Sequence, residues 1–325
     1  METKQLYKLF DRKYEKEVRP FIEESIPRNR FSEPVFYILD NFQLRRFRSA
    51  FPLIFAEEYQ IPKEKVLPIA AASELIFTIA LVQDDIIDGD KKRGKIPAAH
   101  IKYGTENCIA SSDYMHAHVS RMLASLRKKD INPKIVLGVL DSFTDANERL
   151  YRSFMAERLE ANNFGLPLKA ILETYKDKTI QGTNSLFCST VVCTGNNRLA
   201  GVIQNYSYDL AVAGQIKNDI YDATSYLENR GYSDLENSYI TYIIRKLLDS
   251  TSETEKEELT KRILARDDEY IIGAIKSKNI IQLCLDDCNT YVKSAISRVK
   301  GRFSANLEEI LLTWAEGNRK FSRKI

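Results

Sequence analysis

Glycine and proline are scarce in this chain, with 13 and 9 of 325 residues, against usual frequencies of about 7% and 5%. Such a shortage of turn-forming residues argues against a fold of many short strands. No alternating apolar run bounded by turn residues occurs either, so a β-sheet domain is not indicated. The absences favour long helices joined by few corners.

An excess of one charge sign is also missing. The chain has 48 basic and 45 acidic residues and a net charge of +3, which gives no electrostatic footprint for nucleic acid. The charged N-terminal sequence does not resemble a signal peptide. The most apolar run, residues 69–82, is shorter than the about 20 residues that a membrane span needs. We therefore expect a cytoplasmic protein without a transmembrane segment and without a nucleic-acid partner.

Cysteine and histidine give no catalytic or metal-binding pattern. The five cysteines are an odd number without a tight framework, which argues against a disulfide-stapled secreted domain. No histidine lies near Cys284 and Cys288 to complete a zinc site. We interpret the three histidines as structural: His100, His116 and His118.

Helical periodicity is present almost throughout the chain. Segments that begin near Pro62 and Pro133 predict long helices, and Gly195 and Gly231 are placed as helix C-caps. No linker, repeat or low-complexity tract is visible. We predict a single all-α domain over residues 1–325, with nearly all-apolar core helices wrapped by amphipathic ones.

The first functional candidate is "QDDIIDGDKKRG", directly after the most apolar helix. Asp84 and Asp88 are four residues apart and share a helix face with Asp85 to the side, where like charges repel unless a cation compensates. Oxygen ligands without histidine or cysteine suit magnesium. Other acidic pairs, such as "RDDE" and "LDDC", are interpreted as solvated helix faces.

A second cluster, "GQIKNDIYD", repeats this spacing with Asn218, Asp219 and Asp222. Two such helices facing each other would form a cup of oxygen ligands for several magnesium ions bridged by a polyanion such as diphosphate. Basic residues that lie beside apolar helices are candidates to bind that diphosphate. They are Arg45, Arg48, Arg93 and Lys178.

Together these segments resemble the trans-type isoprenyl diphosphate synthases, or polyprenyl synthetases. "DDIID" is similar to the first aspartate-rich motif of that family, "KKRGKIPAAHIKYG" to the segment after it, "DKT" to the central Lys-Thr pair and "GQIKNDIYD" to the second motif. The resemblance covers roughly residues 40 to 240. It implies an isoprenoid synthase-type bundle of long antiparallel helices around a central cavity, and a homodimer.

The resemblance also implies a reaction and a set of roles. A magnesium-dependent prenyltransferase would condense an allylic diphosphate with isopentenyl diphosphate to give a longer polyprenyl diphosphate. Three Mg²⁺ ions would be held by both motifs, Asp84, Asp85, Asp88, Asn218, Asp219 and Asp222. Lys92, Lys178, Thr179 and Gln215 would bind the allylic diphosphate, with Lys178 and Gln215 catalytic. Arg45, Arg48 and Arg93 would hold isopentenyl diphosphate.

The chain departs from the family pattern mainly on the isopentenyl side. "QLRRFRS" lacks two usual glycines and has Arg45 in the place of a lysine. Phe77 stands where many members have histidine or glutamine, Asn218 replaces an aspartate, and Tyr239 stands in the place of a lysine. Ile79 and Ala80 precede the first motif, where bulky residues block chain growth, and predict room for a medium or long product.

Three functions therefore remain open. Chain elongation is the leading one. A terpene synthase on the same scaffold would ionise a prenyl diphosphate without isopentenyl diphosphate, and Phe77 fits it well; prenyl transfer to another acceptor is a variant. A non-catalytic partner subunit is the third, and the intact "DDIID" argues against it.

Overall fold

The computed structural model describes residues 1–225 and 239–319, which are almost wholly helical. The N-terminal part contains α1 (Thr3–Lys13), the π-helix η1 (Tyr14–Val18), α2 (Arg19–Ser25), α3 (Glu33–Asn41), α4 (Phe47–Glu58) and the 3-10 helix η2 (Lys63–Lys65). The middle contains α5 (Leu67–Asp88), α6 (Ala99–Tyr103), α7 (Thr105–Ala124), the 3-10 helix η3 (Ser125–Lys128) and α8 (Pro133–Leu159). Next come α9 (Leu168–Lys178), α10 (Ile180–Thr194), α11 (Asn197–Ser225) and α13 (Tyr242–Asp249). The C-terminal part contains α14 (Glu253–Leu264), α15 (Asp268–Ser277), α16 (Ile280–Val299) and α17 (Ala305–Gly317). The prediction of an all-α fold is confirmed.

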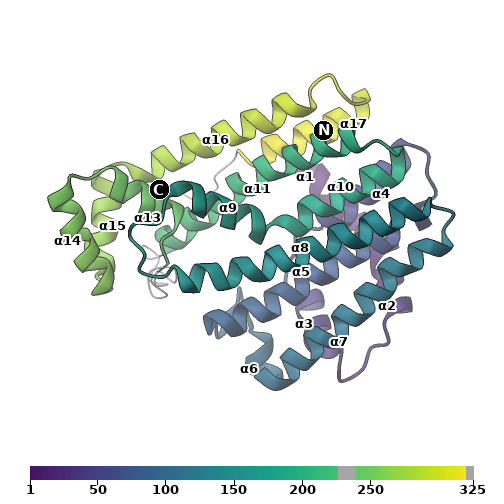
Figure 1. Ribbon diagram of the computed structural model, residues 1–325, viewed down its shortest axis with the longest axis horizontal. Helices are drawn as coiled ribbons and strands as arrows, with labels where there is room; N and C mark the ends of the chain where they lie inside the picture. Colours follow the sequence, from purple (N-terminus) through teal and green to yellow (C-terminus); the bar gives the residue numbers. More distant parts are fainter. Residues whose placement is uncertain (226–238, 320–325) are drawn as a thin grey trace.

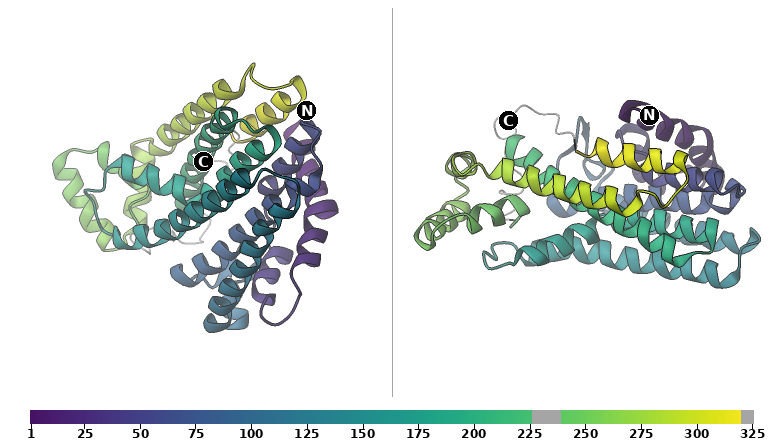
Figure 2. Two further views of the ribbon diagram at one scale, coloured as in Figure 1. Left: turned by 45° about the vertical axis from the view of Figure 1, so that its right-hand side comes forward. Right: turned by 90° about the horizontal axis from the view of Figure 1, so that it is seen from above.

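Helices α4, α5, α10 and α11 pack against one another in the interior of the bundle. Helix α8 runs beside α5 and α10, and α7 covers the other side of α5 (Figure 1). Helix α16 lies along α11 and, with α17, forms one side of the bundle (Figure 2). The small α14–α15 pair stands at one end. Two of these interior helices, α5 and α11, carry the two acidic motifs.

Helix α5 is the core helix that carries the first acidic motif. Its small residues at positions 70–72 are fully buried, which lets neighbouring helices approach closely. Pro68 lies in the first turn, where its missing N–H costs no hydrogen bond, and Gly89 ends the helix with a φ of +73°. By length and composition α5 could cross a membrane, but 78% of the relevant window is buried inside the protein. It is therefore a core helix of the bundle.

The segment from residue 168 to 195, predicted as one helix, is divided in two. The division falls at Thr179, whose φ and ψ of −107° and 3° are not helical. The Thr179 hydroxyl donates hydrogen bonds to the carbonyls of Tyr175 and Lys176, at 2.8 and 3.3 Å. Such bonds compete with the helical pattern. Gly195 ends α10 with a φ of +64°, as predicted, whereas Gly231 lies outside the described residues.

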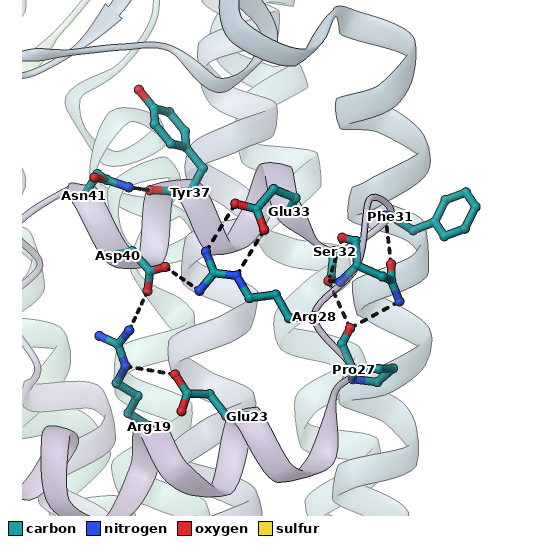
Figure 3. Close-up of polar contacts among 11 residues, drawn as sticks. Arg19, Glu23, Pro27, Arg28, Phe31, Ser32, Glu33, Tyr37, Asp40 and Asn41 are labelled. Atoms are coloured by element: carbon teal, nitrogen blue, oxygen red, sulfur yellow. Dashed lines mark hydrogen bonds and ion pairs between the residues drawn. The ribbon is translucent and has the colours of Figure 1, made fainter.

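An ion-pair network fixes α3 against α2 and so positions the segment that leads to Arg45 and Arg48. Arg28 pairs with Glu33 at 3.0 Å and with Asp40 at 2.8 Å, and Arg19 also reaches Asp40, at 3.1 Å (Figure 3). Because two arginines share one carboxylate at the end of α3, the start of the following loop is held in place.

A short hairpin, absent from our sequence prediction, follows α5. Strand β1 (Lys92–Arg93) pairs antiparallel with β2 (Ile96–Pro97). Gly94 in the turn has a φ of +61°, and a Cβ atom there would lie 3.2 Å from the ring of Phe42. The hairpin folds Arg93 back toward the end of α5.

Candidate active site

The first acidic wall is the C-terminal end of α5. Arg93 donates from Nε to Asp85 Oδ1 at 2.8 Å and from Nη2 to Asp84 Oδ2 at 3.1 Å. Asp85 is fully buried, and burial raises its pKa although Arg93 opposes the shift. Burial and the neighbouring Asp84 raise the pKa of Asp88. These carboxylates are therefore crowded, as their helical spacing predicts.

Tyr239 closes over this wall from a segment far along the chain. Its hydroxyl donates a hydrogen bond to Asp88 Oδ1 at 2.8 Å. The bond favours the carboxylate form of Asp88 and opposes the effect of burial on its pKa. Tyr239 thus supplies a neutral donor at the position where the resemblance leads us to expect a lysine.

We expect Tyr239→Phe to lower the free energy of unfolding at pH 7 by about 1.5 kcal/mol, because a hydrogen bond to a charged group is lost. Urea denaturation of the ligand-free protein measures this change. Tyr270→Phe is the control, because Tyr270 lies on the exposed face of α15. Equal unfolding midpoints for the two variants would mean that the bond to Asp88 contributes nothing to stability.

The second acidic wall belongs to α11. Asn218 is exposed, and Asp222, four residues on, is partly buried on the same helix face. Burial is the largest cause that raises the pKa of Asp90, and Asp85 is the next. Asp222 on the second wall raises the pKa of Asp90 as well. The walls are therefore within electrostatic range of each other.

Asp219 has a different environment from its two neighbours. It is 6% exposed, and its Oδ2 accepts hydrogen bonds from the Tyr175 hydroxyl and from the Tyr242 N–H, the latter at 2.9 Å. Burial raises the pKa of Asp219 well above its ordinary value. Asp219 thereby joins α9, α11 and the start of α13, while its prediction as a metal ligand stays a prediction.

Lys178 and Glu157 lie within electrostatic reach of both walls. Lys178 Nζ pairs with Glu157 Oε2 at 2.5 Å. Burial raises the pKa of Glu157, Lys178 lowers it, and Asp84 and Asp88 raise it again. Lys178 is also among the groups that stabilise the charged form of Asp88. Its role in binding a diphosphate stays a prediction.

The two walls fit magnesium only when another ligand shares the ion. Among residues 1–225 and 239–319, no three Asp, Glu, His or Cys side chains converge closely enough to hold a metal by themselves. The buried Asp85 Oδ2 has no hydrogen-bond partner there, and the donors are all oxygens. This matches a cation that takes one or two carboxylates and completes its coordination with water and phosphate.

A cavity of about 400 Å³ opens beside the second wall. Three cationic side chains line it: Arg45 and Arg48 near the start of α4, and Lys217 on α11. We call it the basic cavity. No aspartate or glutamate belongs to the lining, all of which lies in the described part of the chain. The lining residues used below also include Phe77, Thr179, Gln215, Asn218 and Trp314.

The Arg48 side chain is stacked between two aromatic rings in the basic cavity. Its Cζ lies 3.4 Å from the ring centroid of Phe77 and 4.4 Å from that of Phe47. Its Nε is buried without a hydrogen-bond partner in the described chain. Burial lowers the pKa of Arg48 to about 10, although Glu74 opposes the shift, so the side chain is still cationic at neutral pH.

The structure separates the remaining basic residues by environment. Arg46 is buried and pairs with Glu74 at 2.7 Å, so it is a structural residue. Lys92 is exposed on β1. Thr179 and Gln215 line the basic cavity, as does Asn218. Glu157 and Lys217 were not predicted from the sequence. Glu157 carries no sequence signal, whereas Lys217 is a cation inside the second motif.

A helical bundle with two acidic walls in electrostatic range of each other, a lysine that reaches both and a basic cavity alongside fits a prenyltransferase of the isoprenoid synthase fold. The family model described as polyprenyl synthetase matches residues 28–276. The chain belongs to the polyprenyl synthetase family.

Relatives agree with this membership. A prenyl transferase of Cyanophora paradoxa is 29% identical over 220 residues, 64% of each chain. A geranylgeranyl diphosphate synthase of Saccharolobus solfataricus is 24% identical over 250 residues, 73% of this chain and 74% of that protein. The aligned part thus spans about two thirds to three quarters of these relatives.

Solved structures show the same fold over nearly the whole chain. The geranylgeranyl pyrophosphate synthetase of Pyrococcus horikoshii has a TM-score of 0.83 at 22% identity, covering 97% of this chain and 99% of that one. A decaprenyl diphosphate synthase of Rhodobacter capsulatus has a TM-score of 0.85 at 17% identity, covering 99% and 100%. A Caulobacter crescentus polyprenyl synthase, solved with calcium and isoprenyl diphosphate, has a TM-score of 0.83 at 18% identity, covering 99% and 98%.

Proposed function

We propose that the protein condenses an allylic prenyl diphosphate with isopentenyl diphosphate and releases a longer polyprenyl diphosphate and inorganic diphosphate. The observation that carries this proposal is the pairing of two separate sites for anions. The acidic walls with Lys178 suit a diphosphate bound through metal ions. The basic cavity suits a second diphosphate bound directly by cations. Two adjacent diphosphate sites are what a condensation of two diphosphates requires.

In this mechanism the chain's own residues orient the substrates and stabilise the departing charge. Asp84 and Asp88 on one wall and Asn218 and Asp222 on the other would hold magnesium. When bound, Mg²⁺ neutralises the charge that develops on the allylic diphosphate as its C–O bond breaks. Lys178, within reach of both walls, stabilises the same charge.

The second substrate reacts from the basic cavity. Arg45 and Arg48 hold its diphosphate, so that its double bond can reach the allylic carbon. Its π-electrons form the new C–C bond, and the proton lost from the adduct passes to the released diphosphate. Gln215, which lines the cavity beside Asn218, lies at the boundary between the two substrates.

The experiment that tests this function is a product analysis with Mg²⁺ and geranyl or farnesyl diphosphate, with and without isopentenyl diphosphate. We expect a longer prenyl diphosphate that forms only when isopentenyl diphosphate is present. A hydrocarbon or alcohol formed equally well without it would overturn elongation. An inactive protein in both reactions would favour a non-catalytic subunit.

A terpene synthase is the second candidate, because Phe77 replaces a polar residue. The position of Phe77 favours elongation over this alternative. Its ring face lies against the Arg48 guanidinium, so the aromatic surface presents a cation to the cavity. The positive charge of Arg48 would repel a carbocation formed in the cavity. The same charge attracts the diphosphate of an acceptor.

The remaining expectations extend this proposal. The protein is cytoplasmic and forms a homodimer of one-domain chains, and three Mg²⁺ ions take part in the reaction. Ile79 and Ala80 are both buried in α5, and their modest size before the first motif leaves the prediction of a medium or long product in place.

A further inference from the structure

Most buried cations in the described part of the chain have a carboxylate partner. Arg46 pairs with Glu74, and the half-buried Arg93 pairs with Asp84 and Asp85. This pattern is expected, because a charge taken out of water without a partner is destabilising. A buried cation without such a partner therefore indicates a place where stability is given up for binding.

Lys217 is such a cation. It is only 7% exposed, and it makes no hydrogen bond or ion pair with any residue in the described ranges. It lines the basic cavity from α11, one turn after Gly214.

The composition of the cavity lining shows what kind of ligand would compensate this charge. Arg45 contacts the ring of Tyr7, with its Cζ 5.7 Å from the ring centroid, and has no carboxylate partner in the described chain. Arg48 is stacked on Phe77 with its Nε unpaired. Three cations and no carboxylate around about 400 Å³ fit a compact ligand with two or three negative charges.

We propose that Lys217 binds the diphosphate of the acceptor substrate, as a third cation beside Arg45 and Arg48. This inference rests on the proposed function and adds a specificity-determining residue to it. In this chain Phe77 supplies no hydrogen bond to the acceptor, and Lys217 provides the missing interaction from the opposite helix. The acceptor is thereby restricted to a molecule with a diphosphate, because an uncharged acceptor would leave the Lys217 charge uncompensated.

The test compares Lys217→Met, which keeps length and removes charge, with Lys217→Arg, which keeps charge. We expect Lys217→Met to raise the KM for isopentenyl diphosphate about tenfold, the scale of a lost charge-assisted phosphate contact. The KM for the allylic diphosphate should stay unchanged, and Lys217→Arg should retain most of the affinity for isopentenyl diphosphate. Lys293→Met, on the exposed face of α16, is the matched control.

Two further measurements separate binding from structure. Calorimetric titration of isopentenyl diphosphate into the protein should show the same tenfold loss for Lys217→Met without any turnover. Thermal unfolding of the ligand-free protein should show that Lys217→Met does not lower Tm, because Lys217 has no partner to lose among the described residues. A residue that only supports the fold would lower Tm when replaced.

The outcomes also separate this inference from the proposed function. A wild-type protein that neither elongates a prenyl chain nor binds isopentenyl diphosphate would overturn both. A wild-type protein that does both, with Lys217→Met unchanged in KM and in calorimetry, would overturn the role of Lys217 alone. A Tm decrease together with weaker binding of both substrates would assign Lys217 a structural role and overturn the inference.

Discussion

Replacing Asp84 by asparagine is expected to lower kcat by about 10⁴-fold, which corresponds to about 5.5 kcal/mol of transition-state stabilisation. Asp84 lies one helical turn from Asp88, and both carboxylates would share the cations that balance the departing diphosphate. An amide keeps the size of the side chain but removes its charge. Single-turnover measurement of allylic diphosphate cleavage reports on this step without the contribution of product release.

The fold should tolerate this substitution. Asp84 makes only the longer of the contacts to Arg93, at 3.1 Å, while Asp85 retains its own contact at 2.5 Å. Loss of the repulsion from Asp84 also relieves Asp88, so we expect the free energy of unfolding to change by less than about 0.5 kcal/mol. Asp286→Asn, on an exposed face of α16, is the control and should keep full activity. If Asp84→Asn keeps an activity within tenfold of wild type, Asp84 is not a metal ligand.

The parts of the site that the sequence predicts are those governed by local geometry. Spacings of four residues place Asp84 with Asp88 and Asn218 with Asp222, because residues four apart share a helix face. The apolar run before the first motif predicts the buried helix α5 in the same way. Each conclusion needs only the period of the helix and the chemistry of the side chains.

The parts that the sequence does not predict depend on contacts between distant segments. Glu157 meets Lys178 across 21 positions of the chain, and Tyr239 meets Asp88 across 151. Glu157 belongs to no motif, and the identity of Tyr239 alone does not indicate a bond to Asp88. The non-helical φ and ψ occur at Thr179, whose hydroxyl donates to carbonyls of the preceding turn. Whether a threonine interrupts a helix in this way depends on the packing around it. Hydrophobic periodicity contains no information on any of these contacts.

Replacing Lys178 by methionine is expected to lower kcat by about 10³-fold, because a cation within reach of both acidic walls is lost where negative charge develops. It should also destabilise the protein, since Glu157 loses its partner at 2.5 Å. The pKa of Glu157 is already raised by burial and by Asp84 and Asp88, and it rises further without Lys178. Steady-state kinetics and urea denaturation measure the two effects separately.

The two effects of Lys178 can be separated with the double variant Lys178→Met/Glu157→Gln. A carboxyl group whose pKa is raised by folding contributes stability at acidic pH that is lost as pH rises through the folded-state pKa. The destabilisation of Lys178→Met should therefore grow as pH rises above the ordinary pKa of a glutamate, and it should be absent from the double variant, which has no charge at position 157. Activity should nevertheless stay low. The glutamine removes the uncompensated negative charge at position 157, but it does not replace the positive charge of Lys178. Recovery of activity in the double variant would contradict a role in diphosphate stabilisation and would make Lys178 a counterion of Glu157 alone.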